Sequence, residues 1–266
     1  FTLAPVPGAI ASLGAEPAFV GVTEGLVIDL DDLAAKAGQA DVLLLSHMRG
    51  HICDMDRLVA LCEAHGLTLI EDCAHTMGAH WRGRPTGRWG RMGCFSTQTY
   101  KHMNAGEGGL LVSDDPQAMA RAILLSGSYM LFDRHRAAPP PEAFAQLKYD
   151  TPNVSGRMDN LRAAILRPQL ADLDRQCARW NALHAAVDAG LAETPGLTRI
   201  ERAEAEGFVA SSYQFLLLDW PGDAIEAVLA RCARRGVELK WFGAAEPQGF
   251  TSRYDSWHYA PATPMP

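Results

Sequence analysis

The chain has 266 residues, of which 48% are hydrophobic and 21% are charged, and its formal net charge at pH 7 is −7. This composition is typical of a globular protein with one large domain or two ordinary ones. The negative net charge, with no run of lysine and arginine, argues against a general nucleic-acid surface. No apolar stretch has the length of a membrane span and no leader pattern is present, so the sequence predicts no membrane protein.

The cysteines are scattered along the chain without the spacing of a CxxC motif or of a Cys/His metal site. They are Cys53, Cys62, Cys73, Cys94, Cys177 and Cys232. This pattern predicts reduced, mostly buried thiols in a cytoplasmic protein, and no metal site.

The first part of the chain alternates between helical and strand patterns. Residues 10–13 are expected to end a helix, and residues 17–22 are a strand candidate. Asp29 is placed to cap a helix over residues 30–37. The apolar run Val42–Leu45 has the length of a strand that is buried on both faces.

The alternation continues through the centre of the chain. Asp54 is placed to cap a helix that ends near residue 65, and a strand at Leu67–Ile70 follows it. Two further apolar segments, Met92–Phe95 and Leu110–Val112, are also strand candidates. Such an order of strands and helices predicts a mostly parallel α/β sheet, in which ligands bind beyond the carboxyl ends of the strands.

The second half predicts longer helices and then a smaller unit. A helix is expected over residues 115–126, then an aperiodic ordered loop, and then one long helix with a break at Pro168. Beyond Gly196 the pattern predicts a small α+β unit. The expected ranges are 132–149 for the loop, 159–191 for the long helix, 212–218 and 236–241 for strands, and 223–235 for the last helix.

Four chemically active side chains follow the central strands. Asp72 ends one strand and His75 follows it, while Ser96 ends another and Lys101 comes five residues later. Pyridoxal phosphate needs a lysine that holds its aldehyde as a Schiff base and a carboxylate that keeps its ring nitrogen protonated. It also needs hydroxyl and backbone donors for its phosphate. Each residue alone has an ordinary structural explanation, so the prediction depends on their order and context.

The same stretch resembles the DegT/DnrJ/StrS family of PLP-dependent sugar aminotransferases. The family motif Glu-Asp-x-Ala-(Gln or His) is present as Glu71–His75, and Cys-Phe-Ser is present as Cys94–Ser96. The segment that the family lysine opens is present as Lys101–Gly109. Weaker matches lie at residues 13–20 and at Arg157-Met158, so the resemblance covers most of the chain.

The resemblance implies the fold type I (aspartate aminotransferase-like) architecture: a large domain with a mostly parallel sheet and a smaller α+β C-terminal domain. We expect residues 1–158 to form the PLP-binding domain and residues 159–266 to form the linking helix and small domain. Against the family pattern both domains are expected to be incomplete, so the chain is interpreted as an internal fragment. The resemblance further implies a homodimer with its active site at the subunit interface.

The resemblance also assigns roles to individual residues. Lys101 would be the catalytic lysine, and Asp72 would contact the pyridine nitrogen. His75 would lie near the ring's 3-oxygen, and Ser96 would bind the phosphate with help from Gln98 or Thr99. Asn153 would match the asparagine that reaches the phosphate of the partner subunit.

Some positions depart from the family pattern. Leu3 aligns with an aromatic residue that stacks on the cofactor, and the segment Asn153–Met158 differs from the family's Gly-Tyr-Asn-Tyr-Arg-Met, so that Ser155 is an alternative to Asn153. His47 and Arg49 at a strand end either touch substrate or cofactor or are solvated. The tail Lys240–His258 either lines an acceptor pocket or packs as a loop.

The predicted function is a PLP-dependent aminotransferase that moves an amino group from an amino acid to a keto or aldehyde acceptor. The acceptor class implied by the resemblance is a nucleotide-linked keto sugar or a similar polyol-derived ketone. Two alternatives stay open: a PLP-dependent dehydratase or lyase on the same scaffold, and a non-catalytic binding protein. Retention of Lys101, which some dehydrating relatives replace by histidine, favours aminotransfer.

Overall fold

The computed structural model describes residues 2–128, 131–244 and 257–260. These residues divide into two compact units. One comprises residues 40–184 and 202–212, and the other comprises residues 1–39, 185–201 and 213–266. The division falls within helix α7 (Leu173–Leu191). The domain boundary expected at residue 158 stays a prediction.

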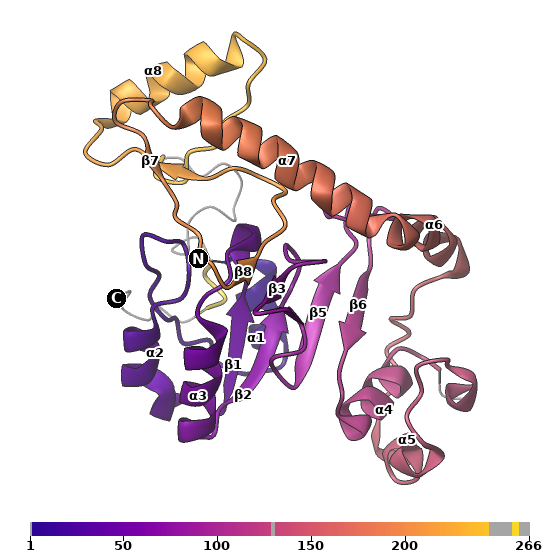
Figure 1. The fold of residues 1–266 in the computed structure, drawn as a ribbon. Coiled ribbons are helices and arrows are strands. Elements are labelled where there is room, and N and C mark those ends of the chain that lie inside the picture. Colours follow the sequence, from indigo (N-terminus) through magenta and orange to yellow (C-terminus); the bar gives the residue numbers. More distant parts are fainter. Residues whose placement is uncertain (1, 129–130, 245–256, 261–266) are drawn as a thin grey trace. The chain divides into compact units, whose positions relative to one another are not determined.

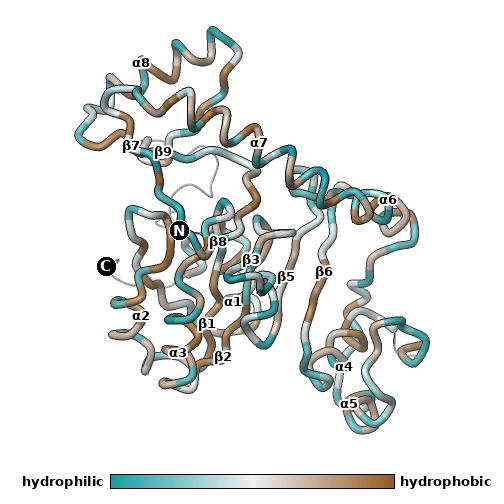
Figure 2. Tube along the Cα trace, viewed as in Figure 1, coloured by the Kyte–Doolittle hydropathy of each residue, from teal (hydrophilic) through white to brown (hydrophobic). Residues whose placement is uncertain are grey.

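A four-stranded sheet is the centre of the first unit (Figure 1). Its order is β1 (Val42–Ser46), β2 (Thr68–Asp72), β5 (Met92–Ser96) and β6 (Gly109–Val112). The first three strands run parallel and β6 runs antiparallel, with Ser46 opposite Asp72 and Asp72 opposite Cys94. Figure 2 shows the hydrophobic character of β1 and β2. The predicted α/β arrangement with a mostly parallel sheet is confirmed.

Three helices begin where the sequence predicts them. The helices are α2 (Leu30–Lys36), α3 (Met55–His65) and α4 (Pro116–Leu125). In each helix the preceding aspartate accepts hydrogen bonds from N–H groups of the first turn, and these aspartates are Asp29, Asp54 and Asp115. Such caps satisfy donors that have no partner within the helix, which is why these starts are readable from sequence.

The remaining elements are short or lie near the ends of the chain. The helices are α1 (Pro5–Ser12), α5 (Leu147–Asp150), α6 (Asn160–Ala171) and α8 (Gly222–Ala233). The strands are β3 (His80–Trp81), β4 (Arg84–Pro85), β7 (Thr198–Arg199), β8 (Glu206–Gly207) and β9 (Phe215–Leu216). The 3₁₀ turns are η1 (Ala37–Gln39), η2 (Met48–Gly50), η3 (Phe132–Arg134) and η4 (Pro141–Phe144). Among the described residues, no helix has the length and apolar character needed to cross a membrane.

Several predicted strands are wrong or too long. In the described segment 17–22 only Val22 pairs, through a single bridge to Ile28, and the described residues 236–241 form no strand. The strand expected over 212–218 shrinks to β9, paired with β7. A run of apolar residues predicts a strand from its length alone. A strand, however, also needs a neighbouring strand that takes its backbone hydrogen bonds.

The predicted break at Pro168 is also wrong. Pro168 lies inside α6, and the break comes at Asp172 between α6 and α7. A proline removes only one N–H group from the helix ladder. At Asp172 the backbone leaves helical geometry, with φ −104° and ψ 2°, and the carboxylate accepts hydrogen bonds from the side chains of Arg175 and Gln176 in the first turn of α7.

Two apolar clusters lie in the first unit, which is called the sheet unit below. The first joins α4 to η4 and contains Ala120, Ile123, Leu124, Ala143 and Phe144. It explains why the predicted loop over 132–149 is ordered and holds short helical turns. The second cluster consists of Met77, Met103 and Leu166. It connects the residues after β2, the segment after β5, and α6.

One buried carboxylate joins three segments of the sheet unit. Glu71 on β2 is fully buried, and its Oε2 accepts hydrogen bonds from His47 Nε2 (3.1 Å) and from the Gly87 N–H (2.8 Å). Its Oε1 accepts from the N–H groups of Trp89 (2.7 Å) and Gly90 (2.8 Å). We call these five residues the Glu71 cluster. It holds the end of β1 and the loop before β5 against β2.

The loop before β5 and the start of β5 pass so close to their neighbours that one position in each requires glycine. A Cβ atom on Gly90 would lie 2.4 Å from the carbonyl oxygen of Leu69, and one on Gly93 would lie 2.3 Å from the Cα of Gly87. Neither backbone neighbour can move aside. The loop can therefore place its N–H groups on Glu71 only with these small residues.

We predict that Glu71→Ala lowers the free energy of unfolding by about 3 kcal/mol or more, because it leaves three backbone donors and a histidine buried without an acceptor. Burial raises the pKa of Glu71, but the hydrogen bond and charge of His47 and the Gly90 and Gly87 N–H groups outweigh this, so the pKa is lowered. The stabilisation is therefore complete above the unfolded pKa and is lost as the pH falls through the folded value. Urea unfolding at pH 7 is the measurement.

The control is Glu63→Ala, at an exposed position on α3. It should change the unfolding free energy by less than about 0.5 kcal/mol. A loss below about 1 kcal/mol in Glu71→Ala would contradict the structural role of the cluster.

Candidate active site

The carboxyl ends of β1, β2 and β5 bring the predicted site residues to one edge of the sheet. Asp72 is the last residue of β2, and its carboxylate is held by two hydrogen bonds. Ser46 Oγ, at the end of β1, donates to Oδ2 at 2.6 Å, and the Ala74 N–H donates to Oδ1 at 3.1 Å. The carboxylate therefore has a fixed orientation before any ligand arrives.

Lys101 lies on the turn that follows β5, and its amine is directed at His75. Lys101 Nζ is 3.0 Å from His75 Nε2. Burial lowers the pKa of the Lys101 amine, the charge of Asp72 raises it, and the charge of Arg49 lowers it, with a net downward shift. The residues Ser46, Asp72, His75 and Lys101 are called the Lys101 site below.

His75 is a neutral imidazole at physiological pH. Burial lowers its pKa to about 3, and the charges of Lys101, Arg49 and His102 act in the same direction. A neutral ring with its proton on Nδ1 presents Nε2 as an acceptor, so it can receive a hydrogen bond from the Lys101 ammonium group. The hydrogen bond between Lys101 and His75 therefore forms without a charge on His75.

Ser96 ends β5, and Gln98 lies in the turn after it that carries Lys101. Ser96 Oγ accepts the N–H of Gln98 at 3.3 Å, and Gln98 Oε1 accepts the N–H of Tyr100 at 3.0 Å. The Gln98 carbonyl accepts the N–H of Lys101 at 3.0 Å. A hydroxyl group that accepts one hydrogen bond still has its own proton to donate. Ser96 thus keeps a hydroxyl proton that it can donate to a ligand.

Asn153 lies elsewhere in the sheet unit. It is exposed in the segment between α5 and α6, and its side chain accepts the N–H of Ser155 at 2.9 Å. Arg157 in the same segment donates to the carbonyl of Gly127 at 3.4 Å. Among the described residues, no hydrogen bond joins Asn153 to the Lys101 site. Its expected target belongs to a partner subunit, so its role stays a prediction.

Two residues near the site were not predicted. Ser46 was missed, although matching the ends of the two parallel strands would have placed it opposite Asp72. His102 is buried next to Lys101 in the chain, and its ring packs edge-on against Trp180 at 5.1 Å. Burial and the Lys101 charge lower the pKa of His102 to about 4. The tail residues 245–256, part of the expected acceptor pocket, lie outside the described residues.

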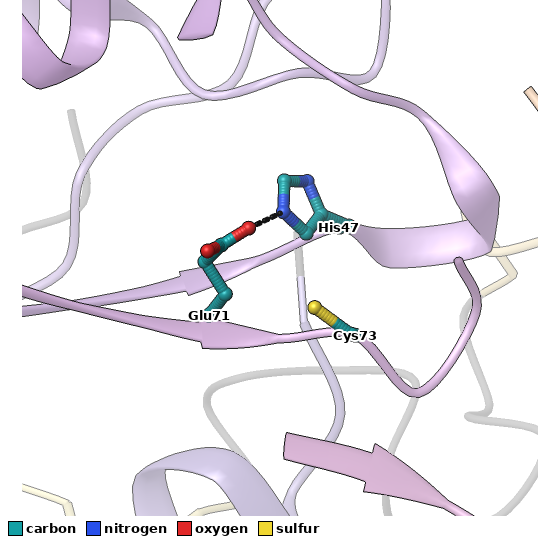
Figure 3. A group of neighbouring side chains, drawn as sticks. All are labelled: His47, Glu71 and Cys73. Atoms are coloured by element: carbon teal, nitrogen blue, oxygen red, sulfur yellow. Dashed lines mark hydrogen bonds and ion pairs between the residues drawn. The ribbon is translucent and has the colours of Figure 1, made fainter. Parts of the chain in front are cut away.

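A second group of polar side chains lies behind the site, and Figure 3 shows its members His47, Glu71 and Cys73. Their ligand atoms lie within 4.8 Å of one another, as in a metal site. However, a carboxylate accepts about four hydrogen bonds, and Glu71 already accepts four. Burial also raises the pKa of the Cys73 thiol, which disfavours the thiolate that a metal binds. These contacts favour a structural role for the group.

The Lys101 site fits pyridoxal phosphate in its chemistry. An amine with a lowered pKa, an oriented carboxylate and a neutral imidazole lie at the carboxyl edge of parallel strands, where α/β proteins bind ligands. A serine hydroxyl lies at the end of the next strand. This donor set matches the aldehyde, ring nitrogen, ring oxygen and phosphate of the cofactor.

Comparisons with known proteins agree with this chemistry. The model of the DegT/DnrJ/EryC1/StrS aminotransferase family matches residues 1–257. L-glutamine:scyllo-inosose aminotransferase of Streptomyces griseus is 32% identical over 82% of this chain and 51% of its own length. dTDP-3-amino-3,4,6-trideoxy-alpha-D-glucose transaminase of Streptomyces venezuelae is 35% identical over 58% of this chain and 38% of its own length.

The fold is found in solved structures of the same kind. The structure of DesV from Streptomyces venezuelae superposes with a TM-score of 0.76 and 27% identity, covering 96% of this chain and 68% of that one. These matches confirm the predicted fold type I architecture. The chain spans about half the length of the curated relatives that it matches.

We predict that the free energy of unfolding falls as the pH is lowered from about 6.5 to 4. His75 and His102 have folded pKa values of about 3 and about 4, below the ordinary value of 6.5, so in this range protons bind mainly to the unfolded chain. His102→Phe keeps a ring against Trp180 and removes one titrating group. The unfolding free energy of this variant should fall less steeply with decreasing pH than that of the parent. The two slopes should differ by up to about 1.4 kcal/mol per pH unit. Urea unfolding at a series of pH values measures both slopes, and equal slopes in variant and parent would contradict the prediction.

Proposed function

The chain belongs to the DegT/DnrJ/EryC1/StrS aminotransferase family, and from this premise we propose that it binds pyridoxal phosphate and transfers an amino group from an amino acid to a keto acceptor. One observation carries the proposal. The Lys101 amine lies 3.0 Å from the neutral His75. Burial lowers the pKa of this amine, although the oriented carboxylate of Asp72 raises it. The net downward shift of the pKa favours the neutral, nucleophilic form of the amine.

Each residue of the Lys101 site has a role in this proposal. Lys101 would hold the cofactor through its aldehyde, and its Nζ atom would carry protons once the donor has taken its place. Asp72, held by Ser46 and Ala74, keeps a proton on the pyridine nitrogen. The bound cofactor supplies the electron sink. Ser96 and Gln98 are proposed to donate to the phosphate, and His75 is proposed to bind the ring oxygen.

The acceptor that we propose is a ketone derived from a polyol or from a nucleotide-linked sugar. Support comes from the relatives, whose names specify scyllo-inosose in one case and a dTDP-linked amino sugar in another. The donor is proposed to be an amino acid, for which L-glutamine is named in one relative. A dehydratase or lyase on the same scaffold would instead release ammonia without needing an acceptor.

We also propose a cytoplasmic location. All six cysteines lie in the described residues, and none of them forms a disulfide bond. Burial raises the pKa of Cys53 to about 12 and also raises the pKa of Cys62, which keeps both thiols protonated and unreactive. Free thiols of this kind are common in a reducing compartment.

We further propose a homodimer, because large apolar side chains lie exposed on the sheet unit. Tyr149 and Leu161 are 76% and 72% exposed, and Ile165 and Leu170 on α6 are also exposed. Large apolar side chains that are exposed at several positions favour association.

We expect full-length protein to sediment at twice its monomer mass, and Leu161→Glu to shift it towards monomer by placing a charge in the interface. Analytical ultracentrifugation is the measurement. A monomeric parent protein, or a variant that dimerises as the parent does, would count against this interface.

We predict that Lys101→Ala removes the covalent attachment of the cofactor. Borohydride reduction of the parent mixed with pyridoxal phosphate should add one cofactor mass to the peptide that contains residue 101, and mass spectrometry detects it. The variant should show no such addition, and its transamination should fall at least about a thousand-fold because both the nucleophile and the proton carrier are lost.

The control is Lys148→Ala, which replaces an exposed lysine on α5. It should label at residue 101 and react as the parent does. Stoichiometric labelling at another lysine, or amino transfer by Lys101→Ala at the parent rate, would refute the assignment.

A further inference from the structure

The Lys101 amine is carried by an irregular turn that follows β5. We call residues 97–106 the Lys101 turn, and none of them lies in a helix or a strand. The base of the turn is closed by a hydrogen bond of 3.0 Å from the Ala105 N–H to the Thr97 carbonyl. Because a lysine side chain is long and flexible, the position of its amine depends on how the backbone of this turn is held.

A glutamine on α6 binds the turn at both backbone groups of one residue. Gln169 Oε1 accepts the N–H of Asn104 at 2.9 Å, and Gln169 Nε2 donates to the carbonyl of Asn104 at 2.8 Å. The side-chain amide therefore pairs with Asn104 much as a residue of a neighbouring strand would. The two residues are 65 positions apart in the chain, so this contact joins α6 to the Lys101 turn.

A third hydrogen bond fixes the orientation of the amide. Gln169 Nε2 also donates to the carbonyl of Ile165, one turn earlier in α6, at 3.0 Å. A glutamine amide has two N–H donors, and both are directed here at carbonyl groups. If the amide were turned over, its oxygen would face two carbonyl oxygens, so only one orientation satisfies all three hydrogen bonds.

Apolar packing brings α6 and the turn together but does not align them. Met103 and Leu166 belong to one apolar cluster. Leu166 is three residues before Gln169, so the two side chains lie on the same face of α6. Burial of apolar surface has no preferred direction, whereas a hydrogen bond weakens steeply when it is bent. The two bonds to Asn104 therefore fix where the turn lies along α6.

The chain beyond the turn adds little rigidity. It passes through Gly106 and Gly108, whose φ angles are 87° and 138°. Glycine permits these conformations, but it also leaves the backbone more freedom than any other residue does. The position of the turn therefore depends on contacts such as those with α6.

A displaced turn would move the lysine amine away from its partner. Asn104 is three residues beyond Lys101, and Lys101 Nζ lies 3.0 Å from His75 Nε2. A hydrogen bond of this length is lost when its atoms move apart by about 1 Å. Misplacement of a reacting group by about 1 Å can slow a reaction about a hundred-fold. The side chain of Gln169 thus acts on the amine through the backbone of the turn.

We propose that Gln169 is a positioning residue that holds the Lys101 amine where it meets the cofactor aldehyde. The inference rests on the proposed function, in which Lys101 holds the cofactor through that aldehyde. Loss of the Gln169 amide should weaken this attachment. It should leave the contacts to the ring and the phosphate in place, because Asp72 and Ser96 belong to β2 and β5.

The test compares two cofactor forms on full-length protein from which the cofactor has been removed. Pyridoxal phosphate carries the aldehyde, whereas pyridoxamine phosphate carries an amino group in its place on the same ring. In Gln169→Met the dissociation constant for pyridoxal phosphate should rise about tenfold or more, because two hydrogen bonds no longer hold the turn. The dissociation constant for pyridoxamine phosphate should change less than about twofold. Equilibrium dialysis measures both.

A second variant and a control complete the comparison. Gln169→Glu keeps an acceptor for the Asn104 N–H and loses the amide donors, so it should show the same selective loss even if Gln169→Met does not fold. Gln117→Met, at an exposed position on α4, is the matched control and should bind both forms as the parent does. Retained binding of pyridoxamine phosphate reports that the fold and the rest of the site are intact.

Two results would overturn the inference alone: unchanged binding of pyridoxal phosphate in both Gln169 variants, or an equal loss of both cofactor forms, which would mean that Gln169 serves only the fold. A parent protein that binds neither form, or that attaches no pyridoxal phosphate to Lys101, would overturn the proposed function and this inference with it.

Discussion

The buried carboxylate of Glu71 is the constraint on which the arrangement of the site depends. Four donors from two segments, His47 after β1 and the loop at residues 87–90, meet on its two oxygens, and Glu71 and His47 are both buried. Neighbouring residues on a strand point to opposite faces, so an inward Glu71 directs Asp72 the other way. Glu71, which holds the strands and loop together, and Asp72, which belongs to the Lys101 site, are thus consecutive residues.

The site gathers ionisable groups whose burial disfavours their charged forms. Burial disfavours protonation of His75 and His102, and it lowers the pKa of Lys101 despite the nearby Asp72. Such environments cost stability in acid, but they provide a neutral imidazole at physiological pH and favour the neutral, nucleophilic form of the Lys101 amine. The left-handed backbone of Arg49, with φ 57° and ψ 19°, is strained and is a cost of the same kind, located at the same edge of the sheet.

Local rules explain which parts of the fold were predictable. Asp29 and Asp54 cap their helices as expected, and Asp115 caps the helix predicted from residue 115, because a cap needs only residues within one turn. The β-pairings at residues 17–22 and 236–241 were predicted wrongly, because a strand is completed by a distant partner that local pattern does not reveal. The helix break was predicted at Pro168, where a backbone donor is missing. That loss does not by itself end the helix, because α6 continues to Ala171.

The sequence by itself determined the chemical inventory of the site and its position after parallel strands, since Asp72, Ser96 and Lys101 follow apolar runs in a readable order. Only the tertiary structure decided which groups act on one another. The Ser46–Asp72 bond spans 26 residues, and the His75–Lys101 contact spans 26 as well. Such contacts depend on strand register and on distances of a few ångströms, and neither quantity is encoded in the spacing of residues along the chain.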